Sequence, residues 1–215
     1  MSAHECGPLD HQYSDQACLG SKISDVPGWF PDRAPEPILK ALRGWKRDGE
    51  LTIHVSRIYR PGEIEFPYPI VEYALHRDGH SDVIGSVAAR LRPSDEARKC
   101  FFGHVGYGVE EEHRSHGFAG RACRMIWPLF TACGISEVWV RAEVENIASC
   151  RTLERLGGKR VERIENIYRA DLPDEFVVKR FNNYLIRPSE DSVRLPNPLD
   201  GMGERSPQSR EEKLA

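Results

Sequence analysis

The sequence predicts an α/β or α+β domain in which a mixed β-sheet has helices packed on it. Hydrophobic residues alternate with polar ones at a period of two in several short segments, which is typical of strands with one buried face. Residues 118–133 instead carry apolar residues at helical spacing. The elements follow one another as strands, helix, strand, helix and strands, and this order favours helices packed on one sheet.

A helix and a strand open the predicted domain. Apolar residues recur at helical spacing before Gly49, at Ile38, Leu39, Leu42 and Trp45. Residues 51–55 then alternate apolar and polar side chains, which predicts a strand. Two further strands, at 70–76 and 83–91, are separated by an Asp78-Gly79 turn signal, so we expect a hairpin.

The second half of the domain alternates strands and helices. A strand at 101–109 precedes the long helix at 118–133, in which Pro128 predicts a kink or a lost backbone hydrogen bond. A strand at 138–144 follows, and Asn146 is expected to cap a short helix that Gly157 and Gly158 end. Two final strands are predicted at the following ranges: 159–168 and 176–186.

Composition excludes several classes of protein. The chain has 215 residues, with 30 Lys plus Arg against 33 Asp plus Glu, so its formal net charge is −3. This near balance argues against a protein that binds nucleic acid, because neutralising the phosphates needs clustered basic residues. No apolar run approaches the ~20 residues that span a bilayer, and the polar N-terminal segment is unlike a secretory signal. We expect a cytoplasmic protein without nucleic-acid or membrane partners.

Three regions of the chain differ in composition. Residues 1–37 are polar and repeatedly interrupted by proline, which predicts an extended lead-in. Residues 38–187 carry the strand and helix signals and are the predicted folded domain. Residues 188–215 mix charge, proline and glycine with few apolar residues, which predicts a mobile tail.

The cysteines and histidines show no metal-binding spacing. The six cysteines form no CxxC pair and have no histidines at matched spacing; they are Cys6, Cys18, Cys100, Cys123, Cys133 and Cys150. We interpret them as small core residues and stray thiols, and we expect no metal.

Glycines within the strand at 101–109 indicate a ligand or another backbone nearby. Gly106 and Gly108 lie in the strand interior, where glycine costs stability and usually marks a close approach. They share a face with His104, and Tyr107 points to the other side. A ligand could therefore lie against the glycine face.

The turn after this strand has the features of an anion-binding loop. Small residues at Gly117, Ala119 and Gly120 allow a bound group to approach the backbone. The unpaired amides at the start of the following helix point outward, and the helix dipole favours negative charge there. Such a turn can hold a phosphate or a pyrophosphate without a metal.

These residues resemble the cofactor-binding motif of the GNAT superfamily of acyl-CoA N-acyltransferases. The family pattern is Gln or Arg, two residues, Gly, any residue, then Gly or Ala, and it stands here as Arg114, Gly117 and Ala119. The segment from Asn146 resembles the family's downstream block, and the order of elements from residue 51 to 186 is also similar. The resemblance is nearest to a poorly characterised bacterial subgroup of acetyltransferases.

The resemblance implies a fold, a cofactor and a reaction. The fold would be a mixed central sheet of about six to seven strands, splayed between the fourth and fifth, with helices on both faces. Acetyl-CoA would place its pantetheine arm between the parted strands, and an amine of a small molecule or a protein would attack the thioester directly, without a covalent enzyme intermediate. The cofactor-binding residues would be Val109, Arg114, Ser115, His116, Gly117, Phe118, Ala119, Gly120, Asn146 and Ser149.

Candidates for the proton-transfer groups follow from position and chemistry. His104 is the first candidate for the base, because it lies on the glycine face and has a suitable ordinary pKa; a structural histidine is the alternative. Glu72 and Glu110 are weaker candidates, and Glu110 also fits a solvated strand end. In many relatives the acid that protonates the leaving thiolate is a tyrosine at the position where this chain has Leu153. That difference leaves the acid open between solvent and another tyrosine.

Two other functions remain open from the sequence. A GNAT-like module that binds acyl-CoA without catalysis would account for Leu153. A nucleotide-binding α/β domain could use the same loop, but no Walker lysine follows the turn. The acceptor and the choice between a monomer and a homodimer are not determined by the sequence.

Overall fold

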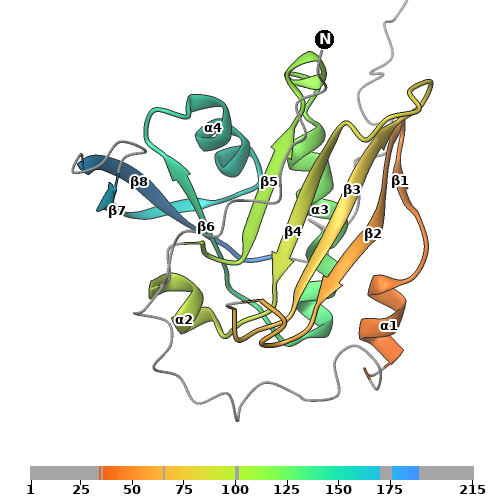
Figure 1. Ribbon diagram of the computed structural model, residues 1–215, viewed down its shortest axis with the longest axis horizontal. Coiled ribbons are helices and arrows are strands. Elements are labelled where there is room, and N and C mark those ends of the chain that lie inside the picture. The colour runs from red at the N-terminus through yellow and green to blue at the C-terminus, as the bar shows by residue number, and fades with distance from the viewer. Residues whose placement is uncertain (1–33, 35, 65, 100–101, 170–175, 189–215) are drawn as a thin grey trace, which may run out of the picture.

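The computed structural model describes residues 34, 36–64, 66–99, 102–169 and 176–188, and its strands form two separate sheets (Figure 1). The first sheet has five antiparallel strands, in the order β1 (Lys46–Asp48), β2 (Leu51–Tyr59), β3 (Ile70–Arg77), β4 (Gly85–Arg90) and β5 (Val105–Val109). The second has three antiparallel strands, in the order β6 (Val138–Glu143), β8 (Phe176–Ile186) and β7 (Lys159–Arg169). The sheet therefore divides between β5 and β6, which confirms the expected splay between the fourth and fifth predicted strands.

Helices cover both faces of this arrangement. Helix α3 (Phe118–Ala132) packs on the first sheet and α1 (Glu36–Leu42) packs on α3; in Figure 1 α3 lies behind this sheet. Helix α4 (Ile147–Arg155) packs on β6 and on α3, whereas α2 (Ser94–Lys99) contacts the opposite face of β6. The α+β class and the helices on both faces are confirmed.

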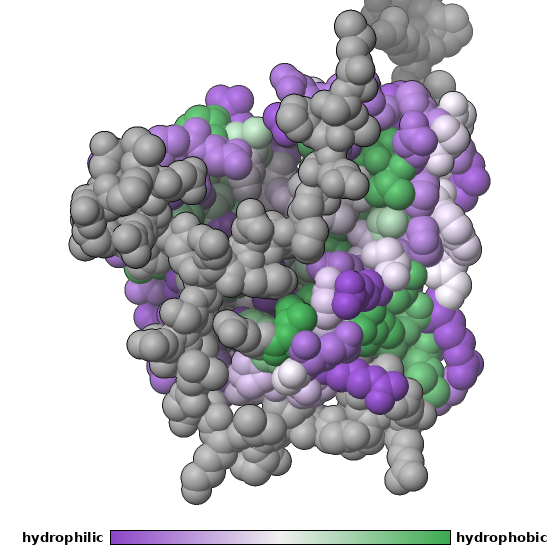
Figure 2. All heavy atoms as spheres, viewed as in Figure 1, coloured by the Kyte–Doolittle hydropathy of each residue, from purple (hydrophilic) through white to green (hydrophobic). Residues whose placement is uncertain are grey.

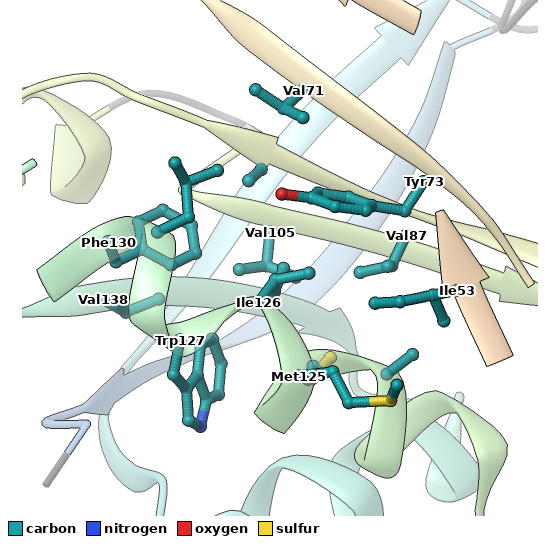
Figure 3. Close-up of a cluster of buried hydrophobic side chains, with 14 of the residues drawn as sticks. Ile53, Val71, Tyr73, Val87, Val105, Met125, Ile126, Trp127, Phe130 and Val138 are labelled. Atoms are coloured by element: carbon teal, nitrogen blue, oxygen red, sulfur yellow. The ribbon is translucent and has the colours of Figure 1, made fainter. Parts of the chain in front are cut away.

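The core lies between the first sheet and α3. Figure 3 shows side chains of the strands meeting those of the helix, among them Ile53, Val87, Val105, Ile126 and Phe130. All five are buried. A fully buried side chain of this size contributes about 1.5–3 kcal/mol, so this contact fixes the start of α3 relative to β5.

The helix predicted near residues 38–49 is shorter than expected. It ends at Leu42, and Gly44 follows with a φ of +71°, a left-handed conformation that stops a helix. Trp45 lies outside it with 63% of its surface exposed, and its ring is tilted against that of His54, with the two centroids 4.2 Å apart. The next residues form β1, a strand that we did not predict; Gly49, with a φ of +55°, makes the turn into β2.

Two further expectations need correction. Helix α2 was not predicted, because only Ala97 of its six residues is buried and the segment therefore has no apolar stripe. Ile147 was assigned to the apolar stripe of the short helix, but it is the first helical residue and is 53% exposed. Cys150 and Leu153 of the same stripe are buried as expected.

The hairpin, the long helix and the cap are confirmed. Gly79 has the left-handed φ of +81° that the Asp78-Gly79 turn requires. Helix α3 runs through Pro128 as one helix, and the side chain of Asn146 caps α4. Residues 1–33 of the predicted lead-in, residues 189–215 of the predicted tail, and Cys6, Cys18 and Cys100 lie outside the described residues. No helix in the described ranges is long and apolar enough to cross a membrane.

Candidate active site

The edge of β5 that faces away from β4 is the first component of the site. In the β4–β5 pairing, the amide of Arg90 donates to the carbonyl of His104, and the amide of Glu110 donates to the carbonyl of Ile84. Successive residues of an antiparallel strand direct their backbone groups to opposite sides. The even-numbered residues of β5 therefore direct their backbone polar groups toward β4.

The odd-numbered residues of β5 direct theirs toward β6. The amides of Tyr107 and Val109 lie on this side, and in the part of the chain that the structure describes no strand pairs with them. The carbonyl of Val109 accepts a hydrogen bond from Nε of Arg114 at 3.0 Å. An unpaired strand edge offers donors and acceptors to any extended group that carries amides of its own.

His104 and Gly103 join the two sheets at one end of this edge. The amide of His104 donates to the carbonyl of Trp139 at 2.7 Å, and the amide of Trp139 donates to Nδ1 of His104 at 2.8 Å. Gly103 has a φ of +52°, and a Cβ atom there would lie 2.6 Å from the carbonyl oxygen of Trp139. Beyond these contacts β5 and β6 are not paired, so His104 lies where the strands begin to part.

The hydrogen bonds of His104 fix its protonation. Nδ1 must accept, because its partner is an amide of Trp139, and Nε2 must donate, because its partner at 3.0 Å is the carbonyl of Arg92. Burial lowers the pKa of His104 to about 4, and the neighbouring Arg92 and Arg90 charges act in the same direction. The side chain is fully buried. Both ring nitrogens are occupied, so the geometry gives His104 no free lone pair with which to act as a base.

The start of α3 is the second component of the site. Its N-cap is Gly117, with a φ of +75°, and no side chain caps the first turn. The amides of the first turn precede the first helical hydrogen bond, which runs from Arg121 to the carbonyl of Gly117. Gly117 is exposed and a Cβ atom on it would meet nothing within 4 Å. The helix start is thus open on the side where an anion would bind.

The loop before α3 is held by its own contacts. Ser115 adopts a φ of +67°, which is uncommon for a residue other than glycine. Nδ1 of His116 lies 2.8 Å from the carbonyl of Arg114, and its ring stacks on Phe118 at 5.4 Å. Of the sequence-predicted loop residues, Arg114, Ser115, His116 and Gly117 are exposed, Ala119 and Gly120 are half-buried, and Phe118 is buried in the core.

Helix α4 brings Asn146 and Ser149 to the other side of the division between the sheets. Oδ1 of Asn146 accepts from the amide of Ser149 at 3.0 Å, so this side chain acts as the helix cap. The hydroxyl of Ser149 lies 2.8 Å from the hydroxyl of Tyr107 on β5. Leu153, by contrast, is fully buried in the core. Sequence reasoning named Ser149 but missed Tyr107, whose side chain points away from the glycine face.

The three candidate bases do not come together. Glu72 of β3 pairs with Ala88 of β4, which in turn pairs with Gly106 of β5. The side chain of Glu72 therefore lies on the glycine face, two strands or about 10 Å from β5. Glu110 is exposed and follows the C-terminal end of β5, whereas His104 precedes its N-terminal end. Glu72 is half-buried and is the only one of the three on the glycine face with its side chain partly open to solvent.

Arg90 lies on the glycine face and is the second residue, after Tyr107, that the sequence analysis missed. It is buried, Nη1 donates to the carbonyl of Phe102 at 3.2 Å, and burial lowers its pKa to about 10 while the charge of Glu72 opposes that shift. A Cβ atom on Gly106 would lie 3.1 Å from the Arg90 guanidinium. Gly106 therefore makes room for this side chain, and the exposed Gly108 remains open. The sequence could have indicated Arg90 only through its position two residues after Ala88 in the same strand, which places both side chains on one face.

The glycine face is the one that Figures 1 and 2 turn toward the viewer, with α3 on the far side. Figure 2 shows its described surface as a mixture of hydrophilic and hydrophobic side chains. A small hydrophobic cluster lies apart from the main core: Ile64 and Phe66 pack on the buried Tyr59, Ile70 and Ala88.

Comparison with known proteins agrees with this geometry. A family model described as an acetyltransferase (GNAT) domain matches residues 22–159. The chain belongs to the GNAT acetyltransferase family. No curated protein matches its sequence. Two solved structures show the same fold: one described as an acetyltransferase, with 14% identity, a TM-score of 0.50 and coverage of 67% of this chain and 87% of the other, and the ribosomal-protein-S5-alanine acetyltransferase from Vibrio fischeri, with 12% identity, a TM-score of 0.50 and coverage of 69% and 98%.

Proposed function

We propose that this GNAT chain is an acetyl-CoA-dependent N-acetyltransferase whose acceptor is an amine of a small molecule or a protein. One observation carries the proposal: the unpaired edge of β5 leads into the uncapped start of α3. The backbone groups of Tyr107 and Val109 and the open amides after Gly117 thus follow one another along the chain. This combination suits a cofactor with an amide-bearing arm at one end and a pyrophosphate at the other.

The pyrophosphate would lie on the amides of residues 117–120. Each hydrogen bond to a charged oxygen contributes roughly 1.5–3 kcal/mol, so a few suffice to anchor the cofactor without a metal. The pantetheine arm would add to β5 as an extra strand, in the manner of a peptide bound to a sheet edge. Arg114 would brace the turn between the two, because it already bonds to the carbonyl of Val109.

Acyl transfer would proceed by direct attack on the thioester. An edge amide of β5, at Val109 or Tyr107, would donate to the oxyanion of the tetrahedral intermediate. Glu72 is the proposed base, acting through water because its strand lies about 10 Å from β5. Burial raises the pKa of the Cys123 thiol to about 12 and that of Cys133 to about 11, so neither supplies a thiolate near neutral pH.

The domain limits and the compartment belong to the same proposal. We infer a catalytic domain that covers residues 38–187, preceded by residues 1–37 and followed by residues 188–215, in a cytoplasmic protein. Helix α1 begins at Glu36 and packs on α3, so the folded part starts about two residues before this limit.

Substitution of Ala119 tests the cofactor site without disturbing the fold. Ala119 is the second residue of α3 and is half-buried. A119E places a carboxylate at the helix start, where it stabilises the helix by about 0.3–1 kcal/mol but repels a pyrophosphate. The neutral variant A119Q adds the same bulk without the charge.

Calorimetry with acetyl-CoA measures the outcome. We expect A119E to weaken binding at least tenfold relative to A119Q, with an unchanged or raised melting temperature. Equal affinity in both variants would refute the proposed pyrophosphate site. Release of free thiol from acetyl-CoA with a panel of amines then separates catalysis from the alternative function, because a non-catalytic acyl-CoA sensor binds the cofactor and turns over with none of them.

A further inference from the structure

Tyr107 is the only ionisable side chain in β5, and it reaches across the division between the sheets. Its hydroxyl lies 2.8 Å from the hydroxyl of Ser149, which belongs to α4. Its own amide lies on the unpaired edge, along which the thioester arm would run. The phenol thus lies between the two elements that flank the proposed path of the cofactor.

Acyl transfer creates a need for an acid at this place. Attack by the amine forms a C–N bond, and collapse of the intermediate breaks the C–S bond and leaves a thiolate, whose negative charge is removed when an O–H group beside the sulfur donates its proton. Burial raises the pKa of Tyr107, and the neighbouring Cys123 adds to the effect, although the hydrogen bond with Ser149 opposes it. The phenol is therefore protonated over the whole working range, so its proton is present when the thiolate forms.

We propose that Tyr107 is the catalytic acid of the acetyl transfer and that Ser149 relays its proton. The electron pair of the C–S bond goes to sulfur, the phenolic proton of Tyr107 goes to the same atom, and the tyrosinate recovers a proton from solvent through the hydroxyl of Ser149. The proton of the attacking amine leaves separately, to the base. This inference rests on the proposed function.

The neighbouring proton donors are otherwise engaged. The hydroxyl of Tyr184, on β8, donates to Oε1 of Glu154 at 3.3 Å, and its side chain is fully buried. The thiol of Cys150 donates to the carbonyl of Glu143 at 3.5 Å. Tyr184 is a matched control for Tyr107, because both are buried phenols near Cys150 and α4 and only Tyr107 lies beside the strand edge.

Paired phenylalanine variants test the assignment. We expect Y107F to lower kcat by roughly 10²–10⁴, the usual contribution of a general acid, and to leave the Kd of acetyl-CoA little changed. S149A should lower kcat less, because solvent can still reprotonate the phenol. Y184F should keep the kcat of the unsubstituted chain.

The pH profile separates an acid from a merely structural tyrosine. Replacing Tyr107 with fluorinated tyrosines lowers the pKa of the phenol, so a fall in kcat at high pH should move to lower pH with each added fluorine. A structural role would leave the profile unmoved. Turnover of Y107F equal to that of the unsubstituted chain overturns this inference alone, whereas failure of the unsubstituted chain to bind acetyl-CoA overturns the proposed function as well.

Discussion

The closed hydrogen bonding of His104 predicts how the stability of the protein depends on pH. The ring is held neutral between the carbonyl of Arg92 and the amide of Trp139, and burial lowers its pKa from the ordinary value of 6.5 to about 4. Between these two pH values His104 binds a proton in the unfolded chain but not in the folded chain. The stability that depends on neutral His104 is therefore complete above pH 6.5 and is lost as the pH falls toward 4.

The size of this effect follows from the shift. Each pKa unit corresponds to about 1.36 kcal/mol. The lowering of the His104 pKa from 6.5 to about 4 therefore corresponds to about 3 kcal/mol of the free energy of unfolding, which is lost as the pH falls through this range. Substitution adds a cost that does not depend on pH, because each buried group that loses its partner costs about 1–3 kcal/mol. H104N can keep an acceptor for the amide of Trp139, and H104Q can keep a donor for the carbonyl of Arg92.

Urea unfolding at pH 7.5, 6.0 and 5.0 measures both parts. At pH 7.5 each variant should be less stable than the unsubstituted chain by the cost of one lost hydrogen bond. At pH 5.0 that difference should shrink, because neither variant has an imidazole to protonate on unfolding. A difference that stays the same at all three values would mean that His104 titrates normally in the folded protein, and the closed geometry would then be wrong.

Two further predictions concern the strand junction and the cap of α4. G103A should destabilise the protein by more than the roughly 1–2 kcal/mol that a left-handed alanine costs, because its Cβ would lie 2.6 Å from the carbonyl oxygen of Trp139. G134A is the control: its φ is +74° with nothing within 4 Å, so equal losses in chemical denaturation would contradict the close approach. N146A should lower the free energy of unfolding by about 1 kcal/mol, because the amide of Ser149 loses its acceptor. N146D supplies a carboxylate acceptor and should restore this stability, as thermal unfolding can measure. An N146A variant as stable as the unsubstituted chain would show that the cap contributes no stability.

Much of the fold was predictable because its signals are local. The alternation in residues 51–55, the apolar stripe of α3 and the cap at Asn146 each depend on a few neighbouring residues and on the period of one element. The short strand β1 and helix α2 escaped prediction because neither buries a periodic face of its own. The loop from Arg114 to Ala119 was singled out because small residues at a helix start suit phosphate binding, and the structure shows that helix start uncapped.

The roles of single side chains depended on contacts between distant segments. His104 looked like a base from its strand position and ordinary pKa, yet Arg92 and Trp139, 12 and 35 residues away along the chain, occupy both of its nitrogens. The sequence placed Tyr107 only on the strand face opposite the glycines, and it is α4, 42 residues away, that brings Ser149 against its hydroxyl. The sequence by itself determined most of the elements, their order and the position of the small-residue loop before α3, since these are set by local spacing. Only the tertiary structure decided which polar groups are occupied and which strand edge is left unpaired, because hydrogen bonds between remote residues do so.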